Sequence, residues 1–423
     1  MNGVWISQCL IIAKIKVSIT ISNIKNKSLL LENIGTLVTA NAITVKIIKN
    51  TSILIESGQI VSIGKGISDN IINCEGKMVT SGFIDSHTHP VFYNNRNSEY
   101  AMRLAGSTYE EIAKNGGGII SSVEGVRKKS EEKLIEKVSE RMDQFIACGT
   151  TTIEAKSGYG LDTKSELKSL KVIEKVNSSH EIDMVPTFMG AHAFPKEFEA
   201  KRAEYLDLIC NEMIPAVASQ GIAIFNDVFC ENGYFSVDES RLILETGKKY
   251  GLKARLHADE FSNSGAAVLA SEVNAFSADH LMAVSDEGIS KLAKSEVVAT
   301  LLPGTTFFLG KKTYAPARKL LDVGITVALA TDFNPGSSHI QSMPFIMTLA
   351  CMNMGMTVEE AYQSATYNGA KALGIENDVG SIEIGKKADL IIWKLDSLMD
   401  IPYYVSNHPI GKVIKNGNII FEA

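Results

Sequence analysis

The sequence lacks several features that mark particular classes of protein. Its 423 residues include only six cysteines, which are scattered and contain no Cys-x-x-Cys pair. This usage fits reduced thiols in a cytoplasm better than a disulfide framework. No stretch approaches the roughly 18 apolar residues that a membrane span needs. The sequence therefore predicts a cytoplasmic protein that does not cross a membrane.

An excess of positive charge is also missing. The chain has 42 Lys and Arg against 48 Asp and Glu, which gives a net charge of -6, and the two signs are interleaved along the sequence. Such a chain offers no basic face for nucleic acid or for an anionic membrane. We expect a small molecule as its partner, and neither nucleic acid nor membrane.

Two kinds of strand-like segment are present. Short β-type runs with hairpin turns occupy 28–78 and 376–423, and each group has too few strands to bury a face alone. We expect the two groups to form one smaller β-sandwich domain. Residues 1–27 are interpreted as an N-terminal extension. Between the two groups, over 79–375, apolar strand-like runs alternate with helical stretches.

Eight such runs in about 250 residues is the number of strands in a (β/α)8 TIM-type barrel, which is an α/β fold. A doubly wound open sheet is the alternative. The predicted strands are 79–89, 151–156, 184–192, 224–230, 253–260, 275–281, 297–303 and 326–334. The helical stretches between them include 130–147, 163–177, 196–219, 236–250 and 285–294.

Two histidines two residues apart end the first predicted barrel strand. Side chains at i and i+2 of a strand point to the same face, so His87 and His89 should converge on one point. Imidazole is a common ligand of zinc, iron and similar ions. A chance pair of surface histidines is the alternative.

Other polar residues end further predicted strands, at the edge where barrel active sites are built. They are His192 in the third strand, His257 and Glu260 in the fifth, Asp279 and His280 in the sixth, and Asp332 and Asn334 in the eighth. Each has an ordinary structural explanation, as a hydrogen-bonded core residue or a helix cap. Together they favour a metal or substrate site.

This arrangement resembles the amidohydrolase superfamily in its single-metal form. The motif segments 156–161, 190–193, 227–231, 257–260, 277–281 and 330–338 narrow the resemblance to the imidazolonepropionase family, over roughly residues 30–420. The resemblance implies hydrolysis of the ring amide of 4-imidazolone-5-propanoate to N-formimidoyl-L-glutamate in histidine degradation. Two features depart from the family pattern, the extension before residue 28 and His339 in place of a proline.

The resemblance also implies a set of metal ligands. His87, His89, His257 and Asp332 would hold one Zn²⁺ or Fe ion per subunit, and such an ion can lower the pKa of water from about 15.7 towards 7. A single ion is favoured because no lysine ends the fourth strand, where binuclear relatives carry a bridging one. Lys156 ends the second strand instead, and we interpret it as a structural ion-pair partner.

Catalytic and substrate-binding roles follow from the same resemblance. Glu260 would carry the proton from water to the leaving ring nitrogen, although Asp332 is an alternative base, and His280 would stabilise the developing oxyanion. Arg96 is the expected partner of the propanoate carboxylate. The other expected substrate contacts are Tyr159, His192, Glu260, Asn334, Gly336 and Ser337.

Two other functions fit parts of the pattern. A cytosine or guanine deaminase of the same superfamily uses similar strand-end residues, but a nucleobase has no carboxylate for Arg96 and Tyr159 to bind. A metal-free scaffold would have no need of all four ligands. We expect the protein to be a homodimer.

Overall fold

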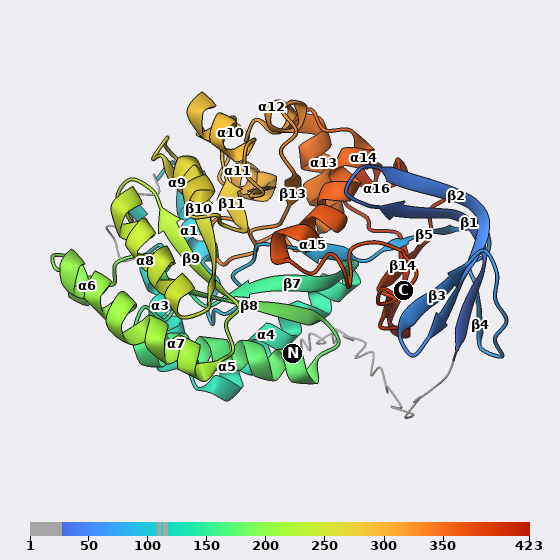
Figure 1. Ribbon diagram of the computed structural model, residues 1–423. Coiled ribbons are helices and arrows are strands. Elements are labelled where there is room, and N and C mark those ends of the chain that lie inside the picture. Colours follow the sequence, from blue (N-terminus) through green and yellow to red (C-terminus); the bar gives the residue numbers. More distant parts are fainter. Residues whose placement is uncertain (1–27, 108–110, 113–116) are drawn as a thin grey trace, which may run out of the picture.

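The computed structural model describes residues 28–107, 111–112 and 117–423 (Figure 1). The predicted extension over 1–27 lies outside the described residues. Two hydrogen-bonded sheets organise the rest, and they stand side by side in Figure 1.

One sheet contains eight parallel strands in chain order. They are β6 Phe83–Asp85, β7 Thr150–Lys156, β8 Asp183–Ala191, β9 Phe225–Cys230, β10 Lys253–Ala258, β11 Ser277–His280, β12 Val298–Leu301 and β13 Val327–Leu329. Just beyond β6 and β13, Thr88 pairs with Phe333, and the N–H of His89 donates to the carbonyl of Phe333 over 2.8 Å. The first and last strands are thus joined, and the predicted (β/α)8 barrel is confirmed.

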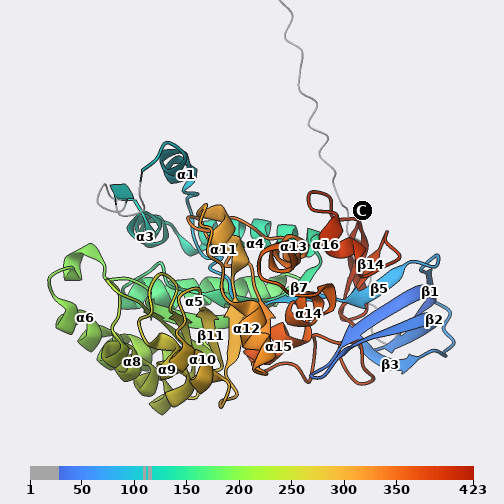
Figure 2. The same cartoon turned by 90° about the horizontal axis from the view of Figure 1, so that it is seen from above.

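Helices surround this barrel (Figure 2). They are α1 Asn97–Leu104, α3 Ile119–Lys128, α4 Glu131–Ala147, α5 Thr163–Ser179, α6 Arg202–Leu208, α7 Ile214–Gln220, α8 Val237–Lys249, α9 Ala266–Glu272, α10 Asp286–Leu292, α11 Pro303–Phe308, α12 Ala317–Asp322, α13 Met343–Asn353, α14 Val358–Ser364, α15 Tyr367–Leu373 and α16 Asp400–Tyr403. In α4 the residues Leu134, Val138, Met142 and Phe145 recur at helical spacing and are all buried, so this helix forms because one apolar stripe faces the barrel.

The predicted helix over 196–219 is wrong in detail. The structure has a 3-10 turn at Lys196–Phe198, then α6, a π-helical turn at Ile209–Met213, and α7. Pro215 lies just after the π-helical turn, inside an unbroken helical run, so its missing N–H removes one intrahelical hydrogen bond there. The apolar periodicity does continue through this region, and for that reason it resembled one helix.

The second sheet joins the two ends of the described chain. Its strands are β1 Leu29–Ala40, β2 Val45–Glu56, β3 Gln59–Ile63, β4 Ile71–Asn73, β5 Met78–Ser81, β14 Leu390–Trp393, β15 Ile410–Lys415 and β16 Asn418–Glu422. Strand β1 pairs with β4 through Leu30–Glu32 and with β5 through Thr36–Val38. Apolar side chains such as Ile34, Ile55, Leu390 and Ile414 form one core from both ends of the chain. The smaller β domain is therefore built as expected.

The predicted strand over 79–89 is wrong in extent, because it is two strands in two sheets. Strand β5 pairs with β1 and β14, whereas β6 pairs with β7 of the barrel. Gly82 separates them, and a Cβ added there would lie 2.4 Å from the side chain of Thr151. Glycine thus permits the close approach at which the chain passes from one sheet to the other. The division into domains at 28–78, 79–375 and 376–423 stays a prediction.

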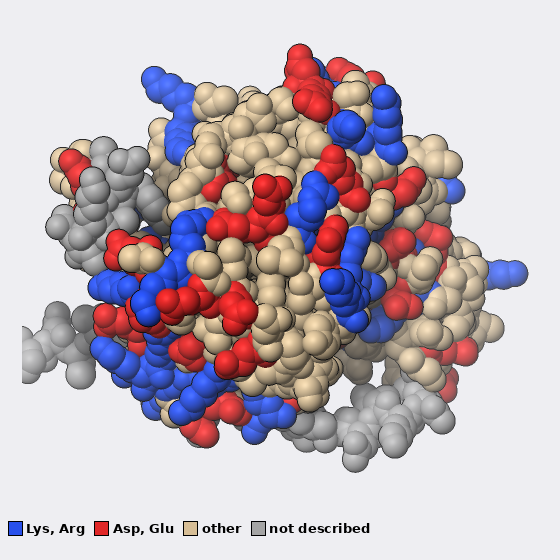
Figure 3. All heavy atoms as spheres, turned by 60° about the vertical axis from the view of Figure 1, so that its left-hand side comes forward, with Lys and Arg blue, Asp and Glu red and all other residues tan. Residues whose placement is uncertain are grey.

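The surface carries both signs of charge. On the side of the molecule shown in Figure 3, Lys and Arg side chains are interspersed with Asp and Glu. Among the described residues, no helix combines the length and the apolar character needed to cross a membrane.

Candidate active site

The four predicted metal ligands lie together at one end of the barrel. His87 and His89 follow β6, His257 lies in β10, and Asp332 follows β13. All four are buried. They meet because the carboxyl ends of parallel barrel strands share one rim.

Their ligand atoms surround a common point. The Nε2 atom of His89 lies 3.3 Å from Nε2 of His87 and 3.4 Å from Nε2 of His257. The Oδ1 atom of Asp332 lies 3.5 Å from Nε2 of His87 and from Nε2 of His89. Ligands about 2.1 Å from one zinc ion stand about 3.4 Å apart at tetrahedral angles. The donor atoms therefore have the spacing that a single small ion requires.

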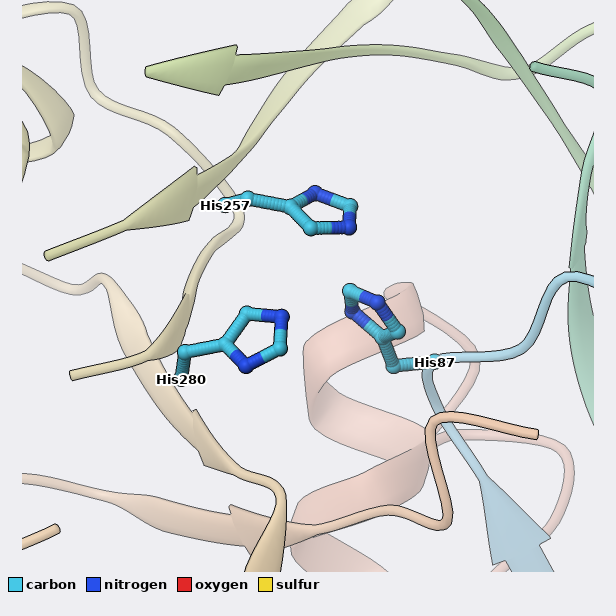
Figure 4. A group of neighbouring side chains, drawn as sticks. All are labelled: His87, His257 and His280. Atoms are coloured by element: carbon cyan, nitrogen blue, oxygen red, sulfur yellow. The ribbon is translucent and has the colours of Figure 1, made fainter. Parts of the chain in front are cut away.

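A fifth candidate ligand, His280 at the end of β11, faces the same point. Figure 4 shows the rings of His87, His257 and His280 turned towards one another, and their ligand atoms lie within 4.8 Å of each other. Neither ring nitrogen of His280 has a hydrogen-bond partner among the described residues. Its Nε2 atom lies 3.6 Å from Oε2 of Glu260. His280 is thus positioned beside both the candidate ligands and the candidate proton carrier.

Two of the histidines make a hydrogen bond from Nδ1 to a buried carboxylate, on the side of the ring that faces away from the common point. The Nδ1 atom of His87 lies 2.7 Å from Oδ2 of Asp279, and Nδ1 of His257 lies 3.1 Å from Oδ1 of Asp227. A carboxylate partner keeps the proton on Nδ1, so the lone pair of Nε2 faces the common point. Both rings are therefore oriented as metal-binding imidazoles are.

Each of these carboxylates has a buried cation of its own. Asp227 accepts from Nζ of Lys156 over 2.6 Å, and Asp279 accepts from Nη2 of Arg255 over 3.2 Å. Lys156 also pairs with Glu154 over 2.7 Å. The predicted ion-pair role of Lys156 is confirmed. Lys156 is also linked to the candidate ligand His257, because both contact the carboxylate of Asp227.

Burial keeps three of the histidines neutral. It lowers the pKa of His87, His89 and His280 well below the usual range, and neighbouring cationic and imidazole groups lower these pKa values further. Neutral imidazole is the form that binds a metal ion. The site is therefore ready to accept a cation at neutral pH.

Two carboxyl groups at the site have raised pKa values, in contrast to the lowered pKa values of the histidines. Burial raises the pKa of Glu260 well above its usual range, and the nearby Asp332 raises it further. Burial also raises the pKa of Asp332 to about 6, although a hydrogen bond from the Thr305 hydroxyl opposes the shift. Carboxyl groups with raised pKa values in a cleft are candidates for proton transfer.

A cleft opens over this group and brings the predicted substrate residues to it. Its lining includes His89, Arg96, Tyr159, His192, His257, Glu260, His280, Asp332, Asn334 and Ser337. The rings of Tyr159 and His192 lie 5.2 Å apart, and His192 stacks on His89 at 5.0 Å. The residues that the sequence placed at separate strand ends thus share one cleft.

Arg96 lies between an acidic partner and the loop that follows β13. Its Nε and Nη2 atoms donate to Oε2 of Glu99 over 2.9 and 2.7 Å. A Cβ added to Gly336 would lie 2.2 Å from Nη1 of Arg96. Gly336 is therefore next to the guanidinium, and any larger residue there would displace it.

The Asn334 side chain shapes the same loop. Its Nδ2 atom donates to the carbonyl of Asp332 over 2.7 Å and to the Ser337 hydroxyl over 2.8 Å. Its Oδ1 atom accepts from the N–H groups of Gly336 and Ser337 over 2.8 and 2.7 Å. This asparagine connects Asp332, a predicted metal ligand, to the segment that contacts Arg96.

Some site residues received no role from the sequence. Asp227 appeared only within a motif segment, and Asp279 only as one of several polar strand-end residues. Both lie inside barrel strands, Asp227 in β9 and Asp279 in β11. The cleft is also lined by the apolar and aromatic residues Ile119, Phe229, Tyr234, Phe261 and Leu309. Aromatic residues in such segments resemble ordinary core positions, and no sequence signal separates the two.

A (β/α)8 barrel that gathers neutral imidazoles and a carboxylate at its strand ends, beneath a polar cleft, has the architecture of a metal-dependent hydrolase. The comparisons with known proteins agree with this class.

The model of the Amidohydrolase family matches residues 78–420. The imidazolonepropionase of Geobacillus kaustophilus is 50% identical over 337 residues, which cover 80% of this chain and 79% of that protein. The imidazolonepropionase of Alkaliphilus metalliredigens is 46% identical over 339 residues, 80% of each chain. The chain belongs to the amidohydrolase family, within its imidazolonepropionase branch.

Solved structures agree with the fold. A zinc-bound adenosine deaminase from Xanthomonas campestris superposes with a TM-score of 0.70 at 17% identity, over 92% of each chain. A guanine deaminase from C. acetobutylicum has a TM-score of 0.66 at 20% identity, over 94% of this chain and all of that one. At such identities the likeness concerns the fold alone.

Proposed function

We propose that the chain hydrolyses the ring amide of 4-imidazolone-5-propanoate and so forms N-formimidoyl-L-glutamate, a step of histidine degradation. The observation that carries this proposal is the presence of Arg96 in the same cleft as the metal-ligand group. An arginine guanidinium binds a carboxylate through charge-assisted hydrogen bonds, and since Nε and Nη2 of Arg96 already donate to Glu99, the tail would be bound at the edge that carries Nη1. The cleft therefore combines a hydrolytic centre with a site for an acidic tail, and the curated relatives carry the corresponding enzyme name.

We assign His87, His89, His257 and Asp332 as ligands of one Zn²⁺ or Fe ion per subunit. The spacing of about one tetrahedral edge between their donor atoms supports this set. Three imidazoles and a carboxylate suit both metals. When bound, such an ion makes water acidic enough to supply hydroxide near neutral pH.

Glu260 is assigned as the proton carrier. It takes a proton from the attacking water and gives it to the ring nitrogen that leaves when the amide bond breaks. Its buried position and raised pKa support this role, because the carboxyl then holds the proton between the two steps. Asp332 is the alternative base, since its pKa is also raised.

His280 is assigned to the substrate carbonyl. As the amide is attacked, negative charge develops on this oxygen, and a hydrogen-bond donor directed at it stabilises the transition state. The ring nitrogens of His280 have no partner among the described residues, and this supports an interaction with substrate.

The acidic tail is assigned to the other wall of the cleft. Arg96 binds the carboxylate, while Tyr159 and His192 donate to the tail or the ring. Gly336 and Ser337 contact the substrate from the loop after β13, and Asn334 maintains the shape of that loop.

The proposal extends to the oligomeric state, the location and the domain bounds of the protein. We propose a homodimer in the cytoplasm that acts on a small molecule with a carboxylate and binds neither nucleic acid nor membrane. We also propose that the barrel spans 79–375 and that the smaller domain comprises 28–78 and 376–423.

A substrate panel tests the reaction. The metal-loaded protein is incubated separately with imidazolonepropanoate, cytosine and guanine, and both product mass and free ammonia are measured. We expect loss of the ultraviolet absorption of imidazolonepropanoate and formation of formimidoylglutamate without ammonia. Ammonia from a nucleobase with no turnover of imidazolonepropanoate would instead identify a deaminase and refute the proposal.

A further inference from the structure

A buried glutamate outside the cleft lining holds the segment that carries Glu260. Glu231 directly follows β9, is 3% exposed, and is not among the residues that line the cleft. Its Oε2 atom accepts from the N–H of Phe261 over 2.8 Å and from the N–H of Ser262 over 3.3 Å. Its Oε1 atom accepts from the N–H of Asn232 over 2.8 Å and from the Ser262 hydroxyl. The carboxylate thus binds the two residues that come immediately after Glu260.

A second carboxylate fixes the other side of Glu260. Asp259 has a left-handed backbone with a φ of 50°, and its Oδ1 accepts from the N–H of Ser264 over 2.9 Å. The same side chain accepts from the N–H groups of Ala266 and Ala267 over 3.2 Å, at the first turn of α9. Glu260 therefore lies in an irregular turn that two carboxylates hold. Asp259 belongs to the turn itself and binds the residues further along it, and Glu231, which follows β9, binds the two residues after Glu260.

We propose that Glu231 is a positioning residue for Glu260. It fixes the backbone of Phe261 and Ser262, and so keeps the Glu260 carboxyl next to His280 and Asp332 without touching the substrate. The inference depends on the proposed function of Glu260 as proton carrier. On this inference, Glu231 at the end of β9 affects the reaction indirectly, through the turn after β10 that carries Glu260.

The chemistry of the contacts requires a carboxylate at this position. Three backbone N–H donors and one hydroxyl surround the two oxygens. Glutamine would turn its NH₂ group towards at least one of those N–H groups, which would leave that donor without its acceptor. Aspartate keeps both acceptors but is shorter by one methylene. We therefore expect Glu231→Gln to loosen the turn more than Glu231→Asp.

A double-mutant cycle separates positioning from a general structural role. The turnover of imidazolonepropanoate is measured for wild type, Glu231→Gln, Glu260→Gln and the double variant, together with metal content and KM. A misplacement of about 1 Å costs around 10²-fold in rate, so we expect kcat to fall about 10- to 100-fold in Glu231→Gln with metal content and KM unchanged. In the Glu260→Gln background the same change should have less than a twofold effect, because the two residues act as one unit. An equal loss in both backgrounds would overturn the proposal.

Hydrogen exchange tests the same idea independently of the reaction. The matched control is Glu272→Gln, which removes one charge at the end of α9 where Glu272 pairs with Arg241 on the surface. We expect faster amide exchange over 259–267 in Glu231→Gln, less so in Glu231→Asp, and none of this change in Glu272→Gln. Unchanged exchange in both Glu231 variants would refute the positioning role whatever the substrate is. A wild-type protein that does not turn over imidazolonepropanoate would refute the proposed function instead.

Discussion

Replacing Asp279 by asparagine should weaken metal binding more than it disturbs the fold. Asp279 Oδ2 accepts from Nδ1 of His87 over 2.7 Å and from Nη2 of Arg255 over 3.2 Å. The amide oxygen of asparagine can still accept a hydrogen bond, but the negative charge is lost. His87 then becomes a weaker base, and its Nε2 atom donates less electron density to an ion.

The structure sets the size of both effects. Loss of a partner behind a ligating histidine typically costs 10- to 100-fold in metal affinity, which is about 1.4–2.8 kcal/mol. Breaking a buried ion pair costs about 3–5 kcal/mol of folding free energy. Arg255 keeps hydrogen bonds to the carbonyls of Ser86, over 2.7 Å, and Ala372, over 3.3 Å, so we expect the lower end of that range.

The control is a similar ion pair away from the site. Asp389 accepts from Nζ of Lys415 over 2.6 Å, both side chains are buried, and Lys415 also keeps a second partner, Asp183 at the start of β8. Asp389→Asn should therefore lower the thermal stability as Asp279→Asn does, but leave metal affinity unchanged. Metal dissociation constants from chelator competition at fixed pH, with melting curves of both variants, provide the comparison. Wild-type affinity in Asp279→Asn, or an equal loss of affinity in Asp389→Asn, would refute the reasoning.

Three further predictions concern the assigned roles. His87→Ala and His257→Ala should each lose stoichiometric metal together with activity, and elemental analysis showing full metal retention in both would contradict the ligand assignment. Glu260→Gln should keep metal and fold but reduce turnover by about 10²- to 10⁴-fold, because an amide cannot take the proton; near-normal turnover would move that role to Asp332 or His280. Arg96→Met should leave metal content unchanged and raise KM for the carboxylate substrate about ten-fold or more, since a charge-assisted hydrogen bond contributes roughly 1.5–3 kcal/mol. An unchanged KM would place the acidic tail elsewhere in the cleft.

Local patterns in the sequence were sufficient to predict the barrel. Strands such as β12 and β13 are short, mostly apolar runs that are buried along their whole length. Helices such as α4 and α8 carry an apolar stripe after a Ser residue. Both signals arise from residues that are close in sequence. The strand-end positions of His87, His257 and Asp332 could be predicted for the same reason, because parallel strands of a barrel bring their carboxyl ends to one rim.

Long-range packing decided the rest. The residues from Met78 to Asp85 are all buried, so composition could not show that the chain changes sheets at Gly82; the close approach of Thr151 determines that point. The close approach of Arg96 to Gly336, in the loop after β13, was likewise not visible in either segment of the sequence.

By itself, then, the sequence determined the fold class and which imidazoles and carboxylates stand at the strand ends, since periodicity and strand order are properties of neighbouring residues. Only the tertiary structure decided that Asp279 supports His87, that Asp227 supports His257, and that Glu231 holds the turn after Glu260. These contacts join residues that lie on, or just after, different strands of the barrel, at distances below about 3.2 Å. Hydrogen bonds of that length depend on how strands are registered across the barrel, and no feature of either residue's own segment encodes that register.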